Sequence, residues 1–535
     1  MASPISTSLT RLSGYVFCAL SLCYIARHLY RVFTSPLRRI PGPSNPSLLF
    51  GNTKELAAAG SSAKLEQWVE EYGPVIKYKD FLGKSRLYTT DTKAINHILM
   101  HHYDYQKPPA GRFLLSQLLG NGVIITEEDP HKFQRRVMNP AFGPAQIRQL
   151  TSVFVEKSIE LCDAWKAQIA KESEPGTNGA GRINVLSGLS KMTLDVIGLA
   201  GFNYQFNAIN TPEGDENELN AAFQTLFSHS SGPSFWSILR MQIPPLRLLP
   251  TFRGKSITSA RNTMDRIGKQ LLEDSKRVST ETGEKSSGRD LLSLLVKSNM
   301  NEKDGERMED EDVLAQVPTF LVAGHETTST ATTWALYALT EHPDVQCKLR
   351  DELMSLPTSE PSMEKLNSLP YLDAFVREVL RLHAPVPGTV RVAMRDGVIP
   401  LSEPVGGKDY VEVAKGQEIA INILALNRSK KLWGEDAREF KPERWLNGSL
   451  NTSLPGVWGN MMTFLGGARA CIGFRFSLVE MKALLFVLVR EFEYELGVPK
   501  EDLAATTSTV VQRPFVKSEK EKGIQLPLLV KPYNP

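Results

Sequence analysis

The spacing of hydrophobic and polar residues predicts a mainly helical chain with a small β subdomain. Residues 65–72 predict a short amphipathic helix that Gly73-Pro74 ends, and residues 75–90 predict two strands joined at Leu82-Gly83-Lys84. Helical periodicity dominates the rest of the chain. Two polar, glycine-rich stretches, 172–182 and 279–289, interrupt it, and we expect both to be surface loops.

A long helix is predicted over residues 312–340. Asp312 could cap its start, and the tripeptide Glu-His-Pro at 341–343 ends it. At 1.5 Å per residue, such a helix is on the order of 40 Å long, which is enough to cross a domain. Pro318 removes one helical hydrogen bond and should bend it.

The middle of this helix, residues 323–330, reads AGHETTST and is unusual. Glycine and β-branched residues are poor helix formers, so this stretch depends on burial for its stability. The acid Glu326 and the alcohol Thr327 at its centre are polar residues in a helix that depends on burial, so their presence needs an explanation. The plain structural reading is that Thr327 bonds back to the carbonyl four residues earlier and that Glu326 reaches a basic neighbour.

The N-terminal segment is apolar. Residues 12–26 carry no charge, and Arg27, Arg31, Arg38 and Arg39 follow. Fifteen uncharged residues fall short of the roughly 20 that a spanning helix needs, and a cleavable signal peptide is the main alternative. The absence of a convincing cleavage site and the basic cluster on the C-terminal side favour an uncleaved anchor over residues 1–35, with the bulk of the chain cytoplasmic. A proline-rich hinge over 36–47 and a catalytic domain over 48–535 complete the expected organisation.

Composition adds three limits. The chain has 535 residues, 41% hydrophobic and 23% charged, which is an ordinary globular balance. Its net charge of +3 argues against a nucleic-acid partner. Its five cysteines are scattered, without zinc-ligand spacing, so we expect no disulfide framework and a reducing compartment.

The stretch from Phe464 to Gly473 contains the strongest chemical signal. It places Cys471 between glycines and directly before an apolar run, 474–489, that predicts a buried helix. Glycines permit a tight turn and a close approach by a flat group, and free N–H groups at a helix start stabilise a thiolate. A haem iron with a cysteine ligand needs such a thiolate. The alternative is that Cys471 is a small buried hydrophobic residue.

This stretch resembles the haem-ligand loop of the cytochrome P450 family at five positions: Phe464, Gly467, Arg469, Cys471 and Gly473. The string Ala-Gly-His-Glu-Thr-Thr, with Glu326 and Thr327, is similar to the family's oxygen-binding motif on its central helix. Glu378 and Arg381, three residues apart on a helix predicted over 371–383, resemble the Glu-x-x-Arg motif, although any surface helix can carry such a pair. Arg444, in the segment 440–445, matches the third member of that structural group.

The resemblance implies the cytochrome P450 fold and haem b, iron protoporphyrin IX, with Cys471 as its axial ligand. Gly324 would leave room for dioxygen, and Thr327 and Glu326 would hold and replenish the water that delivers protons during oxygen activation. The haem propionates would meet Arg469, Arg391, Arg135 and His131, the last standing where the family usually has tryptophan. The substrate would lie against Phe320, Ala323, the segment 114–123 and Val386 beside Pro387.

The implied activity is a monooxygenase reaction, hydroxylation or epoxidation of a hydrophobic small molecule. No flavin or dinucleotide fingerprint occurs in the chain, so electrons would come from a separate NADPH–cytochrome P450 reductase, with cytochrome b5 as an optional second donor. The anchor, the hinge and His131 look most like fungal microsomal members of the family. These imply the endoplasmic reticulum membrane and secondary metabolism such as terpenoid biosynthesis.

Two other functions remain open from the sequence. Some relatives rearrange or dehydrate their substrates without a reductase, but they commonly lack the acid–alcohol pair that Glu326 and Thr327 form here. The chain could also be a membrane-tethered haem-binding protein without turnover, in which case the oxygen-activation motif would have no purpose.

Overall fold

The structure is a computed structural model. It describes residues 33–534, except 60, 173–178, 213–217, 220, 223–239, 241–253, 282–289, 301–306, 447, 449–452 and 509, together with residues 19, 22, 23, 26 and 30. The expected membrane anchor over residues 1–35 therefore lies almost entirely outside the described residues. The described cysteines, Cys23, Cys162, Cys347 and Cys471, are free.

The chain forms two compact units. Unit 1 takes two separate stretches, Met1–Gln106 and Val390–Asn422, and unit 2 takes Lys107–Thr389 and Ile423–Pro535. The elements of unit 1 are η1 Pro36–Arg39, α2 Thr53–Ala59, α3 Ser61–Tyr72, β1 Val75–Lys79, η2 Phe81–Gly83, β2 Ser85–Thr89, α4 Thr92–Met100, β3 Tyr105–Gln106, most of β5 Gly388–Ala393, β6 Gly397–Val405, β7 Lys408–Val413 and β8 Glu418–Asn422.

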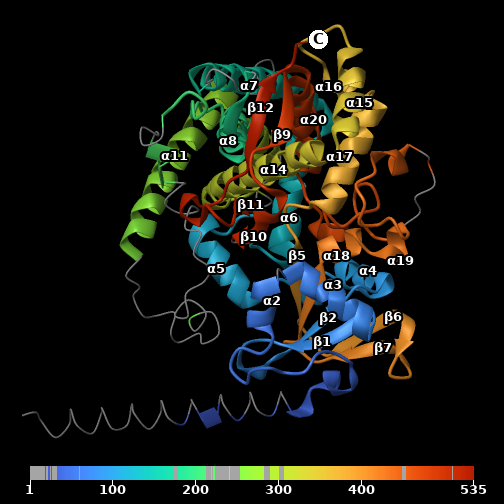
Figure 1. Ribbon diagram of the computed structural model, residues 1–535. Coiled ribbons are helices and arrows are strands. Elements are labelled where there is room, and N and C mark those ends of the chain that lie inside the picture. The colour runs from blue at the N-terminus through green and yellow to red at the C-terminus, as the bar shows by residue number, and fades with distance from the viewer. Residues whose placement is uncertain are drawn as a thin grey trace, which may run out of the picture. The chain divides into compact units, whose positions relative to one another are not determined.

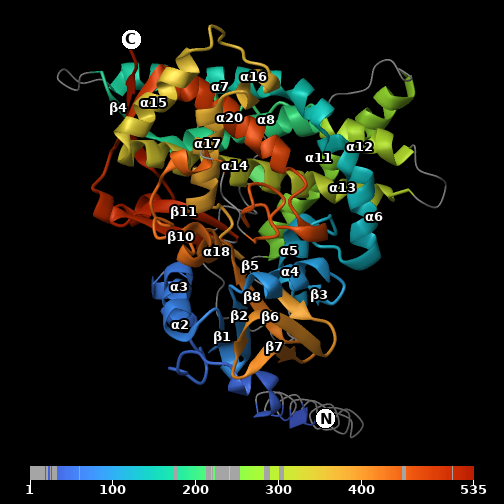
Figure 2. The same cartoon turned by 90° about the vertical axis from the view of Figure 1, so that its right-hand side faces the viewer.

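Unit 1 is built on a mixed five-stranded sheet in the order β1-β2-β8-β5-β3, beside the two-stranded pair β6-β7 (Figure 2). The predicted hairpin over 75–90 is confirmed, since β1 pairs antiparallel with β2 and Val75 lies opposite Thr89. The helix predicted over 65–72 is confirmed as the second half of α3, and Trp68 of this helix packs in a buried cluster with Tyr78 and Tyr88 of the sheet. Residues 41–46 form neither helix nor strand, as their prolines predict.

Unit 2 contains most of the helices. Its elements are α5 Pro109–Leu119, α6 Glu128–Met138, η3 Asn139–Phe142, α7 Pro144–Glu172, β4 Gly181–Asn184, α8 Val185–Phe202, α11 Gly254–Glu281, α12 Leu291–Met300, α13 Asp310–Leu314, α14 Gln316–Glu341, α15 Pro343–Met354, α16 Met363–Asn367, α17 Pro370–Leu382, α18 Ile423–Asn427, α19 Lys430–Trp433, η6 Pro442–Trp445, η7 Gly467–Arg469, α20 Phe474–Glu491, β9 Phe492–Leu496, η8 Lys500–Asp502, β10 Leu503–Ser508, β11 Val511–Val516, η9 Lys520–Lys522 and β12 Pro527–Pro532.

The central element of unit 2 is α14, which contacts α8, α20, α17, α15 and strands β9 and β11 (Figure 1). Its burial explains how the poor helix formers at 323–330 are accommodated, because neighbouring elements cover most of its sides. The helix predicted over 474–489 is confirmed as α20, most of whose residues are buried. Phe476 of α20 packs edge-on against Phe154 of α7, with ring centroids 4.8 Å apart.

The start of the long helix differs from the prediction. Asp312 is no cap: it lies inside the short helix α13, and α14 begins only after Ala315. The Asp312 carboxylate instead accepts a hydrogen bond from Gln134. Pro318 falls in the first turn of α14, three residues after Ala315, where the helix is interrupted, and the bend expected from this proline stays a prediction. The end at residues 341–343 is confirmed, with Pro343 opening α15.

The two predicted loops are only partly loops. Residues 173–178 and 282–289 lie outside the described residues, but Gly181 and Arg182 belong to β4, and α11 continues to Glu281. Strand β4 joins the sheet β4-β12-β9, where Arg182 lies opposite Leu529. The strand could not be predicted because its pairing partner lies at the other end of the chain.

Among the described residues, only α8 is both long and apolar enough to cross a membrane. Seventy-two per cent of it is buried inside the protein, and it packs on α14 and α7. It is therefore a core helix of unit 2.

Candidate active site

The loop that carries Cys471 is folded back on itself. The Cys471 N–H donates to the carbonyl of Phe464 at 2.9 Å. Gly467 has φ +67°, which glycine adopts most easily, and a Cβ on Gly466 would lie 1.7 Å from the carbonyl oxygen of Pro455. The predicted tight turn is confirmed at both glycines. The rings of Trp458 and Phe474 flank Phe464 at 5.8 and 6.0 Å.

The Cys471 thiol is accessible and yet surrounded by protein. Desolvation raises the pKa of this thiol, while the Gly473 N–H and the Arg135 guanidinium lower it by smaller amounts. The N–H contribution expected at the start of α20 is present, but burial outweighs it. A metal ion that coordinates this sulfur would remove its proton.

Helix α6 connects directly to this loop. Arg135 donates from Nη1 to the carbonyl of Ala470 at 2.6 Å and from Nε to Asn139 at 3.0 Å. His131 lies one turn earlier and is buried. Desolvation lowers the pKa of Arg135, and the nearby Cys471 thiolate raises it by less. Of the residues predicted to meet propionates, Arg135 thus contacts the backbone next to Cys471.

The Arg469 side chain is buried, with only 5% of it exposed. Its Nη1 donates to the carbonyl of Thr126 at 2.7 Å, and its Nη2 pairs with the Glu127 carboxylate. Burial, and then the charge of Arg112, lower the pKa of Arg469 to about 10. Neither Glu127 nor Arg112 was a predicted site residue, because no local pattern connects them with residue 469.

Arg391 lies in unit 1, on strand β5. It is among the largest fully buried side chains, and burial lowers its pKa to about 10. Its role towards a propionate stays a prediction.

Helix α14 has one open face in an otherwise covered stretch. Ala323 is exposed and Thr327, one turn later, is half-buried, while residues 325, 326 and 328–336 are all buried. The Thr327 hydroxyl donates to the carbonyl of Ala323 at 2.6 Å. This is the back-bond of the plain structural reading, and it leaves the lone pairs of the hydroxyl free to accept a hydrogen bond from the open face.

Glu326 is paired with Arg513, a residue that sequence reasoning missed. Arg513 Nη2 lies 2.6 Å from Glu326 Oε2, and both side chains are largely buried. Arg513 belongs to β11, which contacts α14 (Figure 1). The backbone of the adjacent Gln512 makes two hydrogen bonds. Its carbonyl accepts from Trp334 Nε1 at 3.1 Å, and its N–H donates to the carbonyl of Pro385 at 2.7 Å.

A second polar contact joins α14 to α20. The hydroxyls of Thr328 and Ser477 are 3.1 Å apart. Glu480, one turn further along α20, is buried, and desolvation raises the pKa of its carboxyl well above the ordinary value, with a smaller opposing effect of Thr328. Burial therefore favours the protonated form of this carboxyl. Sequence reasoning missed both α20 residues, because they lie outside the loop string.

The other predicted α14 residues have packing roles. A Cβ on Gly324 would lie 2.8 Å from Cδ1 of Ile197, so a larger residue there would force the Ile197 side chain of α8 to shift. Room for dioxygen beside Gly324 stays a prediction. Phe320 is buried and packs edge-on against Phe142, with centroids 5.6 Å apart, and against Phe202.

The remaining predicted substrate contacts lie on two segments. The segment 114–123 comprises the end of α5, where Leu114 is exposed, and a turn in which the Val123 N–H donates to Gln316 of α14 at 3.0 Å. Val386 is half-buried in the bend after α17. The substrate roles of both segments stay predictions.

The structural group predicted around Glu378 is formed. Arg381 donates to both carboxylate oxygens of Glu378, at 2.8 and 2.9 Å, and Arg444 Nε donates at 3.0 Å. Trp445 Nε1 and the Lys441 N–H also donate to the carboxylate. This buried group ties α17 to the segment around η6.

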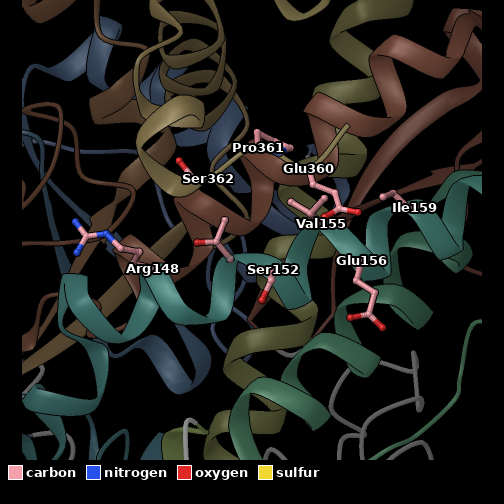
Figure 3. Close-up of a pocket in the computed structure, with 9 residues that line it drawn as sticks. Arg148, Ser152, Val155, Glu156, Ile159, Glu360, Pro361 and Ser362 are labelled. Atoms are coloured by element: carbon pink, nitrogen blue, oxygen red, sulfur yellow. The ribbon is translucent and has the colours of Figure 1, made fainter. Parts of the chain in front are cut away.

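A separate groove of about 630 Å³ lies between α7 and the segment before α16 (Figure 3). Its lining residues are Arg148, Thr151, Ser152, Val155, Glu156, Ile159, Glu360, Pro361 and Ser362. None of the predicted site residues lines it.

Comparison with known proteins identifies the family. A profile of cytochrome P450 matches residues 41–517, most of the chain. The chain belongs to the cytochrome P450 family. Cytochrome P450 monooxygenases 205 and 128 of Postia placenta are 55% and 51% identical to it, over 94% and 97% of this chain and the same shares of their own. Cytochrome P450 monooxygenase claO of Ampulloclitocybe clavipes is 37% identical over 93% of each chain.

P450 enzymes are oxidoreductases that hold iron protoporphyrin IX through an axial cysteine thiolate. The residues of this P450 fit that group. The loop offers one accessible thiol, with Arg135 and Arg469 beside it as partners for carboxylates. Gly473 has φ −88°, which any residue adopts, and a Cβ there would meet only Phe142 at 3.8 Å. The described residues leave room for a larger side chain at position 473. A flat group lying on the loop would take up that room and would therefore require glycine there.

Proposed function

We propose that this P450 uses Cys471 as its haem ligand and inserts one oxygen atom of dioxygen into a hydrophobic small molecule. Two observations support this proposal. Cys471 is exposed, and so is the face of α14 at Ala323 and Thr327, although most residues around both positions in unit 2 are buried. The fungal relatives are named as monooxygenases. We further infer a substrate from secondary metabolism, such as a terpenoid.

When bound, the haem supplies the two-electron activation of dioxygen, and its thiolate ligand favours O–O cleavage. The chain's own residues have three tasks. Cys471 provides the thiolate, and Arg469, Arg135, His131 and Arg391 neutralise the haem carboxylates. Thr327 Oγ1 accepts a hydrogen bond from a water on the open face of α14. Glu326 takes up a proton from solvent and passes it on, which replaces the proton that this water delivers. Phe320, Ala323 and Val386 hold the apolar substrate and exclude bulk water.

Electrons reach this enzyme, in our proposal, from a membrane-bound NADPH–cytochrome P450 reductase, with cytochrome b5 as an optional donor. The N-terminal segment anchors the chain in the endoplasmic reticulum membrane with the catalytic units in the cytoplasm. The uncharged stretch 12–26 and the basic residues after it support this arrangement.

The first experiment is the carbon-monoxide difference spectrum of the dithionite-reduced protein, beside a Cys471→Ser control. We expect a strongly red-shifted Soret band that the substitution abolishes. A red-shifted band that persists in Cys471→Ser, or its absence from folded, haem-loaded protein, would refute the assignment of the ligand.

The acid–alcohol pair separates the proposal from its alternatives. With reductase and a turned-over substrate, Thr327→Ala should lower the product formed per NADPH consumed and raise peroxide release, while Thr327→Ser should retain most of the coupling. A reductase-independent isomerase or dehydratase would form product without NADPH. A haem carrier would bind haem equally well in both variants and form no product.

A further inference from the structure

Glu127 has an unusual position for an acid at the start of a helix. It precedes α6 with φ −126°, yet its side chain does not cap that helix. Its Oε1 accepts from the backbone N–H of Lys107 at 3.1 Å, and its Oε2 pairs with Arg469. Only 5% of the side chain is exposed. A buried carboxylate is costly to keep unless it is paired, so its contacts define its role.

The Arg469 guanidinium has two partners on the same segment. It donates to the carbonyl of Thr126 and pairs with the carboxylate of Glu127, so two consecutive residues hold it. Arg469 ends the short helix η7 and stands two residues before Cys471. The pair therefore fixes the loop of Cys471 to the N-terminal end of α6. Arg135, from the last turn of α6, adds a second connection through its hydrogen bond to the carbonyl of Ala470.

The charges around this pair do not balance. Arg112 of α5 is close enough to act on Arg469, and among the described residues its buried Nε has no hydrogen-bond partner. Arg469 thus has a second guanidinium group near it as well as its carboxylate partner Glu127. The surplus positive charge suits one further anionic group, and a haem carboxylate is the anion that the family brings to this loop.

We propose that Glu127 is a positioning residue for haem retention: it orients the buried Arg469 guanidinium so that this group meets a haem carboxylate without rearrangement. A guanidinium that is already held in place loses less conformational freedom when it binds an anion, which strengthens the contact. Without Glu127, Arg469 keeps one carbonyl partner and can turn towards other acceptors. The inference rests on the proposed ligation of haem by Cys471.

The test compares Glu127→Gln with Glu128→Gln in the full-length, haem-loaded protein. Glu128 is the matched control, because it is the adjacent acid but is exposed. The readout is the rate of haem transfer from the ferric protein to excess apomyoglobin. We expect transfer about tenfold faster in Glu127→Gln, as for loss of a charged hydrogen bond, and a change of less than about twofold in Glu128→Gln. An unchanged rate would overturn the proposal. A slower rate would also overturn it, since Glu127 would then compete with the haem for Arg469.

A double-mutant cycle tests whether Glu127 acts through Arg469. In an Arg469→Gln background, Glu127→Gln should accelerate haem transfer no further. Equal acceleration in both backgrounds would contradict the positioning role. Should Glu127→Gln not accumulate as folded protein, Glu127→Asp replaces it, with a smaller acceleration expected and the same two outcomes against the proposal.

The carbon-monoxide spectrum separates this inference from the proposed function. Glu127→Gln should keep the red-shifted band per haem, because its thiolate ligand is intact. A band that survives in Cys471→Ser would remove the proposed ligand site, whatever Glu127 does. A normal band that is lost in Cys471→Ser, together with unchanged haem transfer in Glu127→Gln, would reject the positioning role alone.

Discussion

The guanidinium of Arg513 lies 2.6 Å from the carboxylate of Glu326, although Arg513 belongs to the β10–β11 hairpin and Glu326 to the central helix α14. The predicted proton-relay acid is therefore held by a strand whose adjacent residue, Gln512, bonds to Pro385, the neighbour of the predicted substrate residue Val386. A change in the β10–β11 hairpin would therefore affect Glu326 through the side chain of Arg513.

Replacing Arg513 should disturb proton delivery more than folding. In Arg513→Met, the Glu326 carboxylate loses its charged partner and its fixed orientation. We expect a severalfold lower yield of product per NADPH and more peroxide, with Arg513→Lys intermediate. Gln512→Ala is the control, since Gln512 meets Trp334 and Pro385 through its backbone, which the substitution keeps. Equal coupling in Arg513→Met and the wild type would show that the pair is structural only.

Gly324→Ala should destabilise the protein by about 1–3 kcal/mol, because the new methyl group would overlap Ile197. Adding Ile197→Val removes Cδ1, so the double variant should be more stable than the sum of the single effects predicts. The measurement is the thermal unfolding midpoint. Gly268→Ala in α11 is the matched control: its Cβ would meet only Leu314 at 3.5 Å, so it should be neutral or slightly stabilising. A tolerated Gly324→Ala would contradict the tight α8–α14 contact.

Glu480 predicts a pH dependence. Burial raises its pKa in the folded protein, whereas in the unfolded chain its pKa is about 4.3. Above that pH the unfolded state releases a proton that the folded state keeps, so the contribution of Glu480 to stability falls as pH rises towards the folded pKa. Glu480→Gln has no such proton. Its stability relative to the wild type should therefore increase between about pH 4 and pH 7, as followed by chemical denaturation. A pH-independent difference would mean that Glu480 is ionised in the fold.

Glu378→Ala should prevent accumulation of the folded protein. It would leave Arg381 and Arg444 buried without their carboxylate, at a cost of about 3–5 kcal/mol. We expect little haem-loaded protein at 37 °C and a lower unfolding midpoint for what remains. Glu435→Gln, an acid whose side chain is 89% exposed, should behave as the wild type. Normal expression of Glu378→Ala would reject the structural role of this group.

The sequence predicted those features that depend on neighbouring residues. The turn before Cys471, the buried helix after it, the hairpin over 75–90 and the Glu378–Arg381 pair each follow from a short string, because glycine conformations, turn residues and helical spacing act locally. Family resemblance added Arg444, which lies 66 residues from its partner Glu378.

The features that were missed all depend on distant partners. Asp312 looked like a helix cap, but the helix breaks at Ala315 and the carboxylate meets Gln134 of α6. Glu127 and Arg513 carry no local signal, since each gains its meaning from a residue far away in the chain, Arg469 and Glu326 respectively. Strand β4 likewise exists only because β12 pairs with it.

The division of unit 1 between two stretches of the chain affects its synthesis. Strand β2 pairs in parallel with β8, and Arg86 bonds to Glu418 at a separation of 332 residues. At roughly 5–20 residues per second, the ribosome needs some tens of seconds to deliver β8 after β2 has emerged. During that interval the β1–β2 hairpin has an open edge beside apolar residues. We therefore expect this edge to need protection in the nascent chain, so that the supply of chaperones rather than of haem sets the first limit on its yield.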